Sequence, residues 1–195
     1  MRPSSSSPAA AKGRRTLVRP GLAGVARMTD MGRKGVSGVA ANPPLKFLVD
    51  DLSGEPTRAL IARHLAGMRA ESPPESVHAL DVDKLRGPDV TFWSAWLGQD
   101  IAACGALKRL DPQRGELKSM RVADGFLGRG VGRALLDFLI GAARTMGMTS
   151  LWLETGCSPA FAPALRLYES AGFVRCGPFE GYTDDPFSVF MTRPL

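Results

Sequence analysis

The sequence predicts an α/β domain in which helices flank a mixed, mostly antiparallel, twisted sheet. Three observations support this fold class. Residues 90–122 contain three strand-like segments joined by two short turns, which is typical of an antiparallel meander. A glycine-rich loop at 127–132 leads into a segment with helical periodicity. Strand-like and helix-like segments then alternate to the end of the chain.

The first 44 residues differ in composition from the rest of the chain. They carry eight of the 25 Lys and Arg residues and one of the 19 acidic residues, with many Ser, Pro and Gly. Such a segment buries too little apolar surface to offset its ordering entropy, so we expect residues 1–44 to form a disordered basic tail. This composition fits an organelle transit peptide, and equally upstream sequence translated from an early start codon, with Met28 or Met31 as the true start.

Residues 45–195 have the size and hydrophobicity of one domain with a real core, and the chain as a whole is 44% hydrophobic. Their acidic and basic residues nearly balance, so the net charge of +6 originates in the tail. A nucleic-acid partner would therefore have to bind through the tail, and we expect none for the domain.

The cysteines and the hydropathy pattern indicate a cytoplasmic protein without a membrane partner. Cys104, Cys157 and Cys176 are odd in number and have no C-x-x-C spacing, which argues against a disulfide framework and a zinc site. The apolar runs are all too short to span a bilayer.

The domain begins with a short strand predicted at residues 45–50. A helix is predicted from about Pro56 to Ala70, because proline fits the first helical turn. Residues 72–76 contain two prolines and end this helix, and residues 77–85 predict a second, shorter helical piece. One face of the first helix is expected to carry Leu60, Ile61, His64, Leu65 and Met68.

Three strands are predicted next, at residues 90–97, 101–110 and 116–122, with turns at 98–100 and 111–115. The last strand alternates, which predicts two faces. One face is expected to carry Glu116, Lys118, Met120 and Val122, and the other Leu117, Ser119 and Arg121.

After the glycine-rich loop, apolar residues follow the helical period for about four turns, and Gly147 is a plausible stop. A second helix is predicted at residues 159–171, ending at Gly172. The remaining strands are predicted at residues 151–155, 173–176 and 187–192.

The loop at 127–132 has the features of an anion site. It leads directly into a helix, so unpaired backbone N–H groups and the positive helix end face the same point. Arg129 and Arg133 add positive charge there. A nucleoside-triphosphatase loop is excluded because no Gly-Lys-Ser or Gly-Lys-Thr occurs, and a Rossmann loop because the third glycine and the alternating β and α segments before it are missing.

Three segments in this order resemble the GNAT superfamily of acetyltransferases: the strand ELKSMRV at 116–122, the loop and helix GRGVGRALL at 128–136, and the helix and strand ALRLYESAGF at 164–173. The resemblance covers about residues 45–195. It implies a GNAT fold in which the strands carrying 120–122 and 151–155 are parallel and splay apart, with the thioester of acetyl-coenzyme A in the resulting V.

The resemblance also implies how the cofactor binds. The loop amides hold the pyrophosphate, the backbone of the strand at 120–122 pairs with the pantetheine arm, and a backbone N–H near Met120 or Arg121 polarises the thioester carbonyl. The implied cofactor-binding residues are Met120, Arg121, Val122, Leu127, Gly128, Arg129, Gly130, Val131, Gly132 and Arg133. Two positions depart from the family pattern: Leu127 replaces the usual Arg or Gln, and Phe161 stands where Asn is common.

Tyr168 is the predicted general acid. Amine attack on a thioester expels a thiolate, and a phenol, with a pKa of about 10, is still protonated at neutral pH and can donate to it. The same position on an apolar helix face suits a core tyrosine. Its place in the Leu167-Tyr168 pair of the GNAT motif favours the acid role.

The attacking amine needs a base, for which Glu116 and Glu154 are candidates, although either fits a structural carboxylate as well. His64 is expected to pack. The acceptor is expected to lie against residues 68–85, where Glu75 and His78 are the predicted substrate-binding residues, and against the loop at 177–186.

We therefore predict direct transfer of an acetyl group from acetyl-coenzyme A to a small-molecule or peptide amine, without a metal or a covalent enzyme intermediate. A non-catalytic acyl-coenzyme A sensor or interaction module of the same fold is the alternative. The sequence leaves the acceptor open, and it leaves the oligomeric state open, with a homodimer among the candidates.

Overall fold

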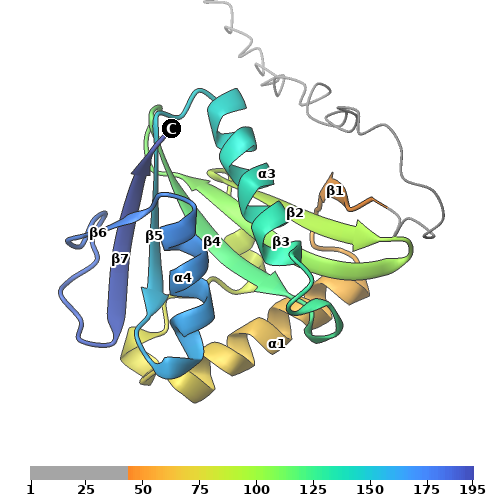
Figure 1. The fold of residues 1–195 in the computed structure, drawn as a ribbon, viewed down its shortest axis with the longest axis horizontal. Helices are drawn as coiled ribbons and strands as arrows, with labels where there is room; N and C mark the ends of the chain where they lie inside the picture. The colour runs from red at the N-terminus through yellow and green to blue at the C-terminus, as the bar shows by residue number, and fades with distance from the viewer. Residues whose placement is uncertain (1–43) are drawn as a thin grey trace, which may run out of the picture. The chain divides into compact units, whose positions relative to one another are not determined.

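A computed structural model describes residues 44–195. The tail predicted at 1–44, with its alternative starts, lies outside the described residues except for Pro44. The described chain folds in the predicted order (Figure 1). Its elements are β1 (Lys46–Val49), α1 (Glu55–Glu71), η1 (Pro74–Ser76), α2 (Val82–Leu85), β2 (Val90–Leu97), β3 (Asp100–Arg109), β4 (Arg114–Val122), η2 (Asp124–Phe126), α3 (Val131–Thr145), β5 (Ser150–Gly156), η3 (Pro159–Phe161), α4 (Ala162–Ser170), β6 (Val174–Cys176) and β7 (Ser188–Pro194).

Within the described residues, seven strands form one sheet in the order β1-β2-β3-β4-β5-β7-β6. The pair β4 and β5 is parallel, and the other neighbouring pairs are antiparallel. The segments from β2 to β4 are the predicted meander, extended by β1 at the edge. The mixed, mostly antiparallel sheet predicted from the sequence is confirmed.

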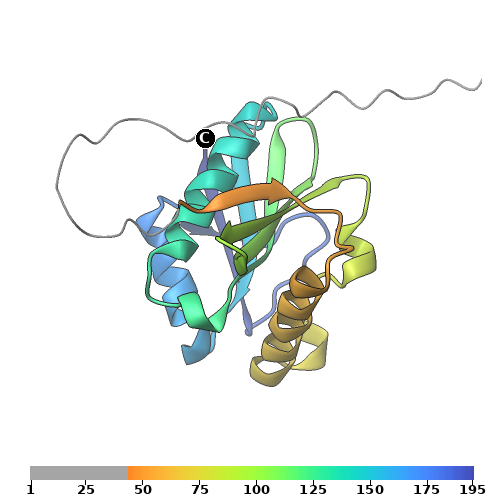
Figure 2. The same cartoon turned by 90° about the vertical axis from the view of Figure 1, so that its right-hand side faces the viewer.

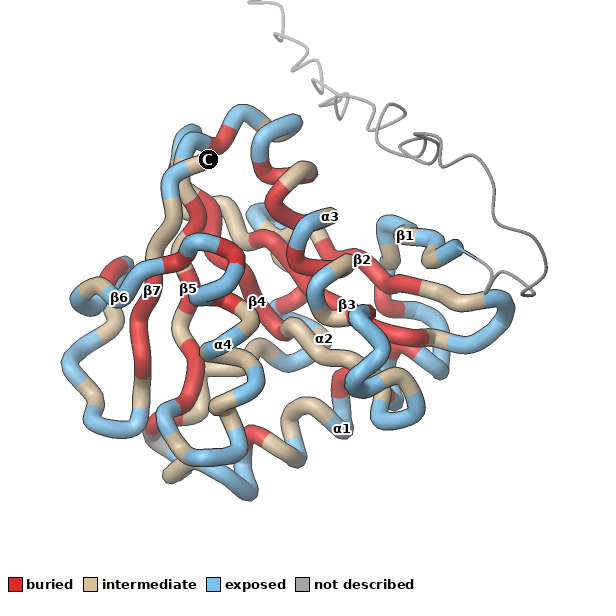
Figure 3. Tube along the Cα trace, viewed as in Figure 1, coloured by how far each residue is buried: buried red, intermediate tan, exposed pale blue. Residues whose placement is uncertain are grey.

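Helices α1 and α3 pack on opposite faces of this sheet (Figures 1 and 2). Alternation along β3 shows why: Ala103 and Leu107 lie in the core formed with α3, whereas Cys104 and Ala106 lie in the core formed with α1. A strand buried on both faces carries apolar residues at successive positions. Buried residues accordingly gather in the central strands and in α3 (Figure 3).

The segment between α1 and β2 is less helical than predicted. Residues 77–81 have no regular structure, and α2 is a single turn that begins only at Val82. The reason is a cap: the side chain of Asp81 accepts a hydrogen bond from the backbone N–H of Lys84 at 2.9 Å. An N-cap aspartate fixes a helix start at its own position.

A β-bulge in β4 changes the direction of its side chains. Two residues of β4, Ser119 and Met120, lie opposite the single residue Gly105 of β3. Ser119 has a φ of 52°, in the left-handed region that non-glycine residues seldom adopt. Bulges of this kind insert one residue and reverse the alternation beyond it. The flanking register pairs are Ala106 with Lys118 and Cys104 with Arg121.

The alternation predicted for residues 116–122 is therefore wrong beyond Ser119. Met120 and Val122 join Leu117 in the core under α3 instead of sharing a face with Lys118. Arg121 turns to the α1 side, where its Nη1 lies 4.0 Å from the position of a Cβ on Gly67. The physical reason is the inserted residue, which a strict period of two does not allow for.

Candidate functional site

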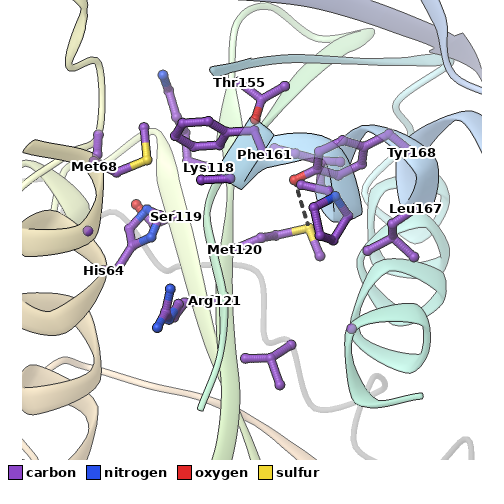
Figure 4. A pocket seen from close by; sticks show the side chains of 18 of the residues that line it. His64, Met68, Lys118, Ser119, Met120, Arg121, Thr155, Phe161, Leu167 and Tyr168 are labelled. Carbon is purple, nitrogen blue, oxygen red and sulfur yellow. Dashed lines mark hydrogen bonds between the residues drawn. The ribbon is translucent and has the colours of Figure 1, made fainter. Parts of the chain in front are cut away.

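A cavity of about 460 Å³ opens where β4 and β5 diverge. The two strands pair only at their first residues, 114–116 with 150–152. Beyond this point residues 117–122 of β4 form one wall of the cavity, Glu154 and Thr155 contribute from β5, and α1 and α4 close it on either side (Figure 4). The predicted divergence of these two strands is thus confirmed.

The glycine-rich loop leads into α3 beside this cavity. Gly128 and Gly130 have φ values of 70° and 79°, which glycine adopts without steric cost. Gly130 is the N-cap of α3, and among the described residues no side chain caps that helix end. Its first backbone N–H groups are therefore available to an anion. Leu127 and Gly132 line the cavity itself.

Arg129 of the loop and Arg133 of α3 are not among the residues that line the cavity. The guanidinium of Arg129 lies 5.1 Å from the centre of the Phe126 ring. Nε of Arg133 lies 2.9 Å from the carboxylate of Asp137, and both side chains are half exposed. An exposed ion pair of this kind contributes little to stability, so Arg133 can turn toward a bound anion.

Tyr168 of α4 lies on the cavity wall, as Figure 4 shows. Its hydroxyl donates to the sulfur of Met120 at 3.8 Å, which is a weak hydrogen bond. Burial, together with the charge of Glu154, raises the pKa of Tyr168 to about 12. The phenol is therefore neutral at pH 7, and its hydrogen is directed at a sulfur atom.

The structure does not bring Glu116 to the cavity. Its carboxylate is buried, accepts a hydrogen bond from the Tyr182 hydroxyl at 2.7 Å, and lies 2.9 Å from Nζ of Lys118. The Lys118 ammonium also contacts the Tyr182 hydroxyl and, at 3.5 Å, the carbonyl of His78. Through these contacts the Glu116 carboxylate links β4 to the loop that carries Tyr182.

Glu154 is the carboxylate that β5 contributes to the cavity wall. It accepts a hydrogen bond from the hydroxyl of Ser188 at 2.8 Å. Burial raises the pKa of Glu154, and the Ser188 hydrogen bond opposes this effect. A carboxylate with a raised pKa is a stronger base than an exposed one.

Of the two predicted substrate-binding residues, His78 lines the cavity and packs edge-on against Tyr182, with ring centres 5.0 Å apart. The side chain of Glu75 lies outside the described part of the structure. The loop at 177–186 supplies Phe179 and Tyr182 to an aromatic cluster behind His78. Phe179 and Tyr182 therefore lie behind the cavity wall and are not themselves among the residues that line it.

Sequence reasoning missed three side chains that line the cavity. His64 was expected only to pack, Ser119 was given no role, and Arg121 was predicted to contact the cofactor through its backbone. The side chains of Ser119 and Arg121 were assigned to the face of β4 opposite Lys118. The charged residues within the ELKSMRV strand were the available signal, because charge inside a central strand needs a partner or a ligand. The direction in which these side chains point depends on the bulge in β4.

Among residues 44–195, no three His, Cys, Asp or Glu side chains gather as a metal site would require. No helix in the same part of the chain combines the length and apolar character needed to cross a bilayer.

Comparison with known proteins agrees with this geometry. A sequence profile of the acetyltransferase (GNAT) family matches residues 57–173. The uncharacterized N-acetyltransferase YsnE of Bacillus subtilis (strain 168) is 51% identical over 147 residues, which are 75% of this chain and 97% of YsnE. The uncharacterized N-acetyltransferase YedL of Escherichia coli (strain K12) is 48% identical over 146 residues, 75% of this chain and 92% of YedL.

A solved structure has the same fold. The GNAT family acetyltransferase from Elizabethkingia anophelis, with acetyl-CoA bound, superposes with a TM-score of 0.58 at 20% identity, covering 80% of this chain and 99% of that one. The family match spans the region from α1 to the start of β6, which contains all the cavity walls described above. The chain therefore belongs to the GNAT family of acetyltransferases and is an N-acetyltransferase.

Proposed function

We propose that the enzyme transfers the acetyl group of acetyl-coenzyme A directly to the amine of a small molecule or peptide. The observation that carries this proposal is the cavity between β4 and β5, which has the glycine-rich loop at its edge and Tyr168 in its wall. An elongated thioester with a phosphate-bearing end fits a cleft that combines these two features.

The backbone of β4 supports the cofactor assignment. Pairing with β5 ends at Glu116, so the edge of β4 that faces the cavity, at residues 117–122, carries free N–H and C=O groups. A pantetheine arm contains amide groups that can pair with such an edge, as an added strand would. The N–H groups near Met120 and Arg121 are then placed to polarise a thioester carbonyl.

Acetyl-coenzyme A supplies an acetyl group activated as a thioester. Glu154 takes a proton from the acceptor ammonium, which frees the amine for attack. As the new C–N bond forms and the C–S bond breaks, Tyr168 donates its hydroxyl hydrogen to the leaving sulfur, as a general acid, and the proton that the new amide nitrogen loses returns to the Tyr168 oxygen through water. The raised pKa of Tyr168 supports this role because it keeps the phenol protonated and able to donate. A phenolate at this position would instead repel the thiolate.

Two glutamates can be distinguished by kinetics. Glu154→Gln is expected to lower kcat/KM about 100-fold, because it removes the proposed base. In the wild-type enzyme kcat/KM should fall as the pH falls through the pKa of Glu154, and this acidic limb should lie above the usual carboxyl range, since burial raises that pKa. The measurement is a pH profile of kcat/KM for both forms.

Glu116→Gln is the matched control, because it makes the same change on the neighbouring strand. It is expected to lower the free energy of unfolding by about 3–5 kcal/mol, since it leaves the buried Lys118 ammonium without its ion pair. The acidic limb should stay in place. An acidic limb that disappears with Glu116→Gln and persists with Glu154→Gln would assign the base to Glu116 instead.

The proposed function is tested by release of free coenzyme A across classes of acceptor: small amines, amino acids, peptide N-termini and peptide lysines. Release that depends on one class, with the acetylated product identified by mass spectrometry, is the expected result. A protein that binds acetyl-coenzyme A but never releases coenzyme A beyond the rate of spontaneous hydrolysis would contradict it.

A further inference from the structure

The α1 side of the cavity carries three polar side chains with free hydrogen-bonding capacity, here called the donor cluster: His64 of α1, and Ser119 and Arg121 of β4. All three line the cavity. Figure 4 shows them together on the α1 side, with Tyr168 on the α4 side and Met120 between. The bulge in β4 creates the cluster, because it turns Arg121 toward α1.

Two donors of the cluster are buried without a partner among the described residues. Ser119 is 8% exposed, and its hydroxyl oxygen makes no hydrogen bond; Nε of Arg121 is likewise unpaired. An arginine nitrogen can only donate. Leaving a buried donor unpaired is destabilising, because the group loses its hydrogen bonds to water and gains none. A ligand that supplies acceptor oxygens here would remove this cost.

The cluster also carries the guanidinium of Arg121. Its Nη2 lies 2.7 Å from the carboxylate of Asp124, which leaves Nε of the same group free to donate. Burial, and then the charge of Arg121, lower the pKa of His64 to about 4, so its imidazole is neutral at pH 7. A guanidinium with a free N–H, beside an unpaired hydroxyl, is typical of a carboxylate site.

We propose that the donor cluster binds a carboxylate of the acceptor, so that the acceptor is a free amino acid or a related molecule with both an amine and a carboxylate. This inference rests on the proposed function. The amine of such a molecule would point toward Glu154, the carboxylate on the β5 side of the same cavity. The cofactor phosphates are not the ligand, because their proposed loop leads into α3, and α3 packs on the opposite face of the sheet.

The test compares the standard L-amino acids and β-alanine with their primary carboxamides as acceptors, at saturating acetyl-coenzyme A. A carboxamide keeps the amine and the side chain but loses the negative charge. At least one amino acid is expected to have a kcat/KM about ten-fold or more above that of its carboxamide. Arg121→Gln should reduce this ratio to about two-fold or less.

Arg63→Gln is the matched control, because Arg63 also binds Asp124 but does not line the cavity. It should leave the ratio of amino acid to carboxamide unchanged. The ratio is the readout because it cancels any general loss of activity in either variant. The wild-type panel decides the proposal even if Arg121→Gln fails to fold.

The inference is overturned if carboxamides react as well as amino acids, if Arg121→Gln keeps the full ratio, or if neither class is acetylated by enzyme that binds acetyl-coenzyme A in calorimetry. Release of coenzyme A with other amines in that last case would leave the proposed function standing. Failure to bind acetyl-coenzyme A at all would instead contradict the proposed function.

Discussion

Gly130→Asp is expected to weaken the binding of acetyl-coenzyme A about 1000-fold, or roughly 4 kcal/mol. The new carboxylate would lie at the start of α3, where the free N–H groups are proposed to hold the cofactor pyrophosphate, and like charges would repel. Isothermal calorimetry with acetyl-coenzyme A measures the change in Kd. Gly132→Asp, which places a carboxylate on the cavity wall, should have a similar effect.

The control for backbone strain is Gly98→Asp. Gly98 has a φ of 66° in the turn between β2 and β3, with open space around it, as Gly130 has at 79°. Both substitutions force aspartate into the left-handed region, at a cost of about 1 kcal/mol each. The two variants should therefore lose similar thermal stability, while Gly98→Asp keeps the wild-type Kd. Wild-type affinity in both Gly130→Asp and Gly132→Asp would refute the loop assignment.

Tyr168→Phe is expected to lower kcat about 1000-fold and to leave the Kd for acetyl-coenzyme A nearly unchanged. The substitution removes only the hydroxyl, which is proposed to donate to the leaving sulfur. Its one described hydrogen bond is the weak contact with the Met120 sulfur, so the fold should lose little stability. Steady-state release of coenzyme A gives kcat, and calorimetry gives the Kd.

Tyr182→Phe is the matched control, since the chain contains two tyrosines. Its hydroxyl donates to buried Glu116 and lies outside the cavity lining, so this variant should lose about 1–2 kcal/mol of stability. Its kcat should stay within a few-fold of wild type. If Tyr168→Phe turned over as fast as Tyr182→Phe, Tyr168 would be a core residue and the general acid would have to be sought elsewhere.

Much of the fold was predictable from local pattern. Strand and helix boundaries from β2 to β7 matched within two residues, except that α4 begins three residues after its predicted start, behind η3, because periodicity and turn residues act over short stretches of chain. The parallel pair β4 and β5 followed from the family resemblance, and the register confirms it. The second helical piece, predicted at residues 77–85, was predicted too long. The N-cap at Asp81 starts α2 only at Val82.

The candidate site was predictable only in part. The loop with Gly130 and the helix with Tyr168 carry recognisable residues in fixed order, and both segments contribute residues to the cavity lining. Glu116 and Glu154 could not be ranked from the sequence. Their difference arises from partners distant in the chain, since Tyr182 and Lys118 bind Glu116, whereas the Glu154 carboxylate lines the cavity.

The amino-acid sequence by itself determined the elements, their order and the position of the glycine-rich loop, because each depends on residues close together in the chain. Only the tertiary structure decided which side chains face the cavity. The pairing of β3 with β4 inserts Ser119 as an extra residue, and this bulge reverses every later side chain in the strand. It turns Arg121 away from the α3 core toward α1, and so makes the donor cluster that we propose selects the acceptor.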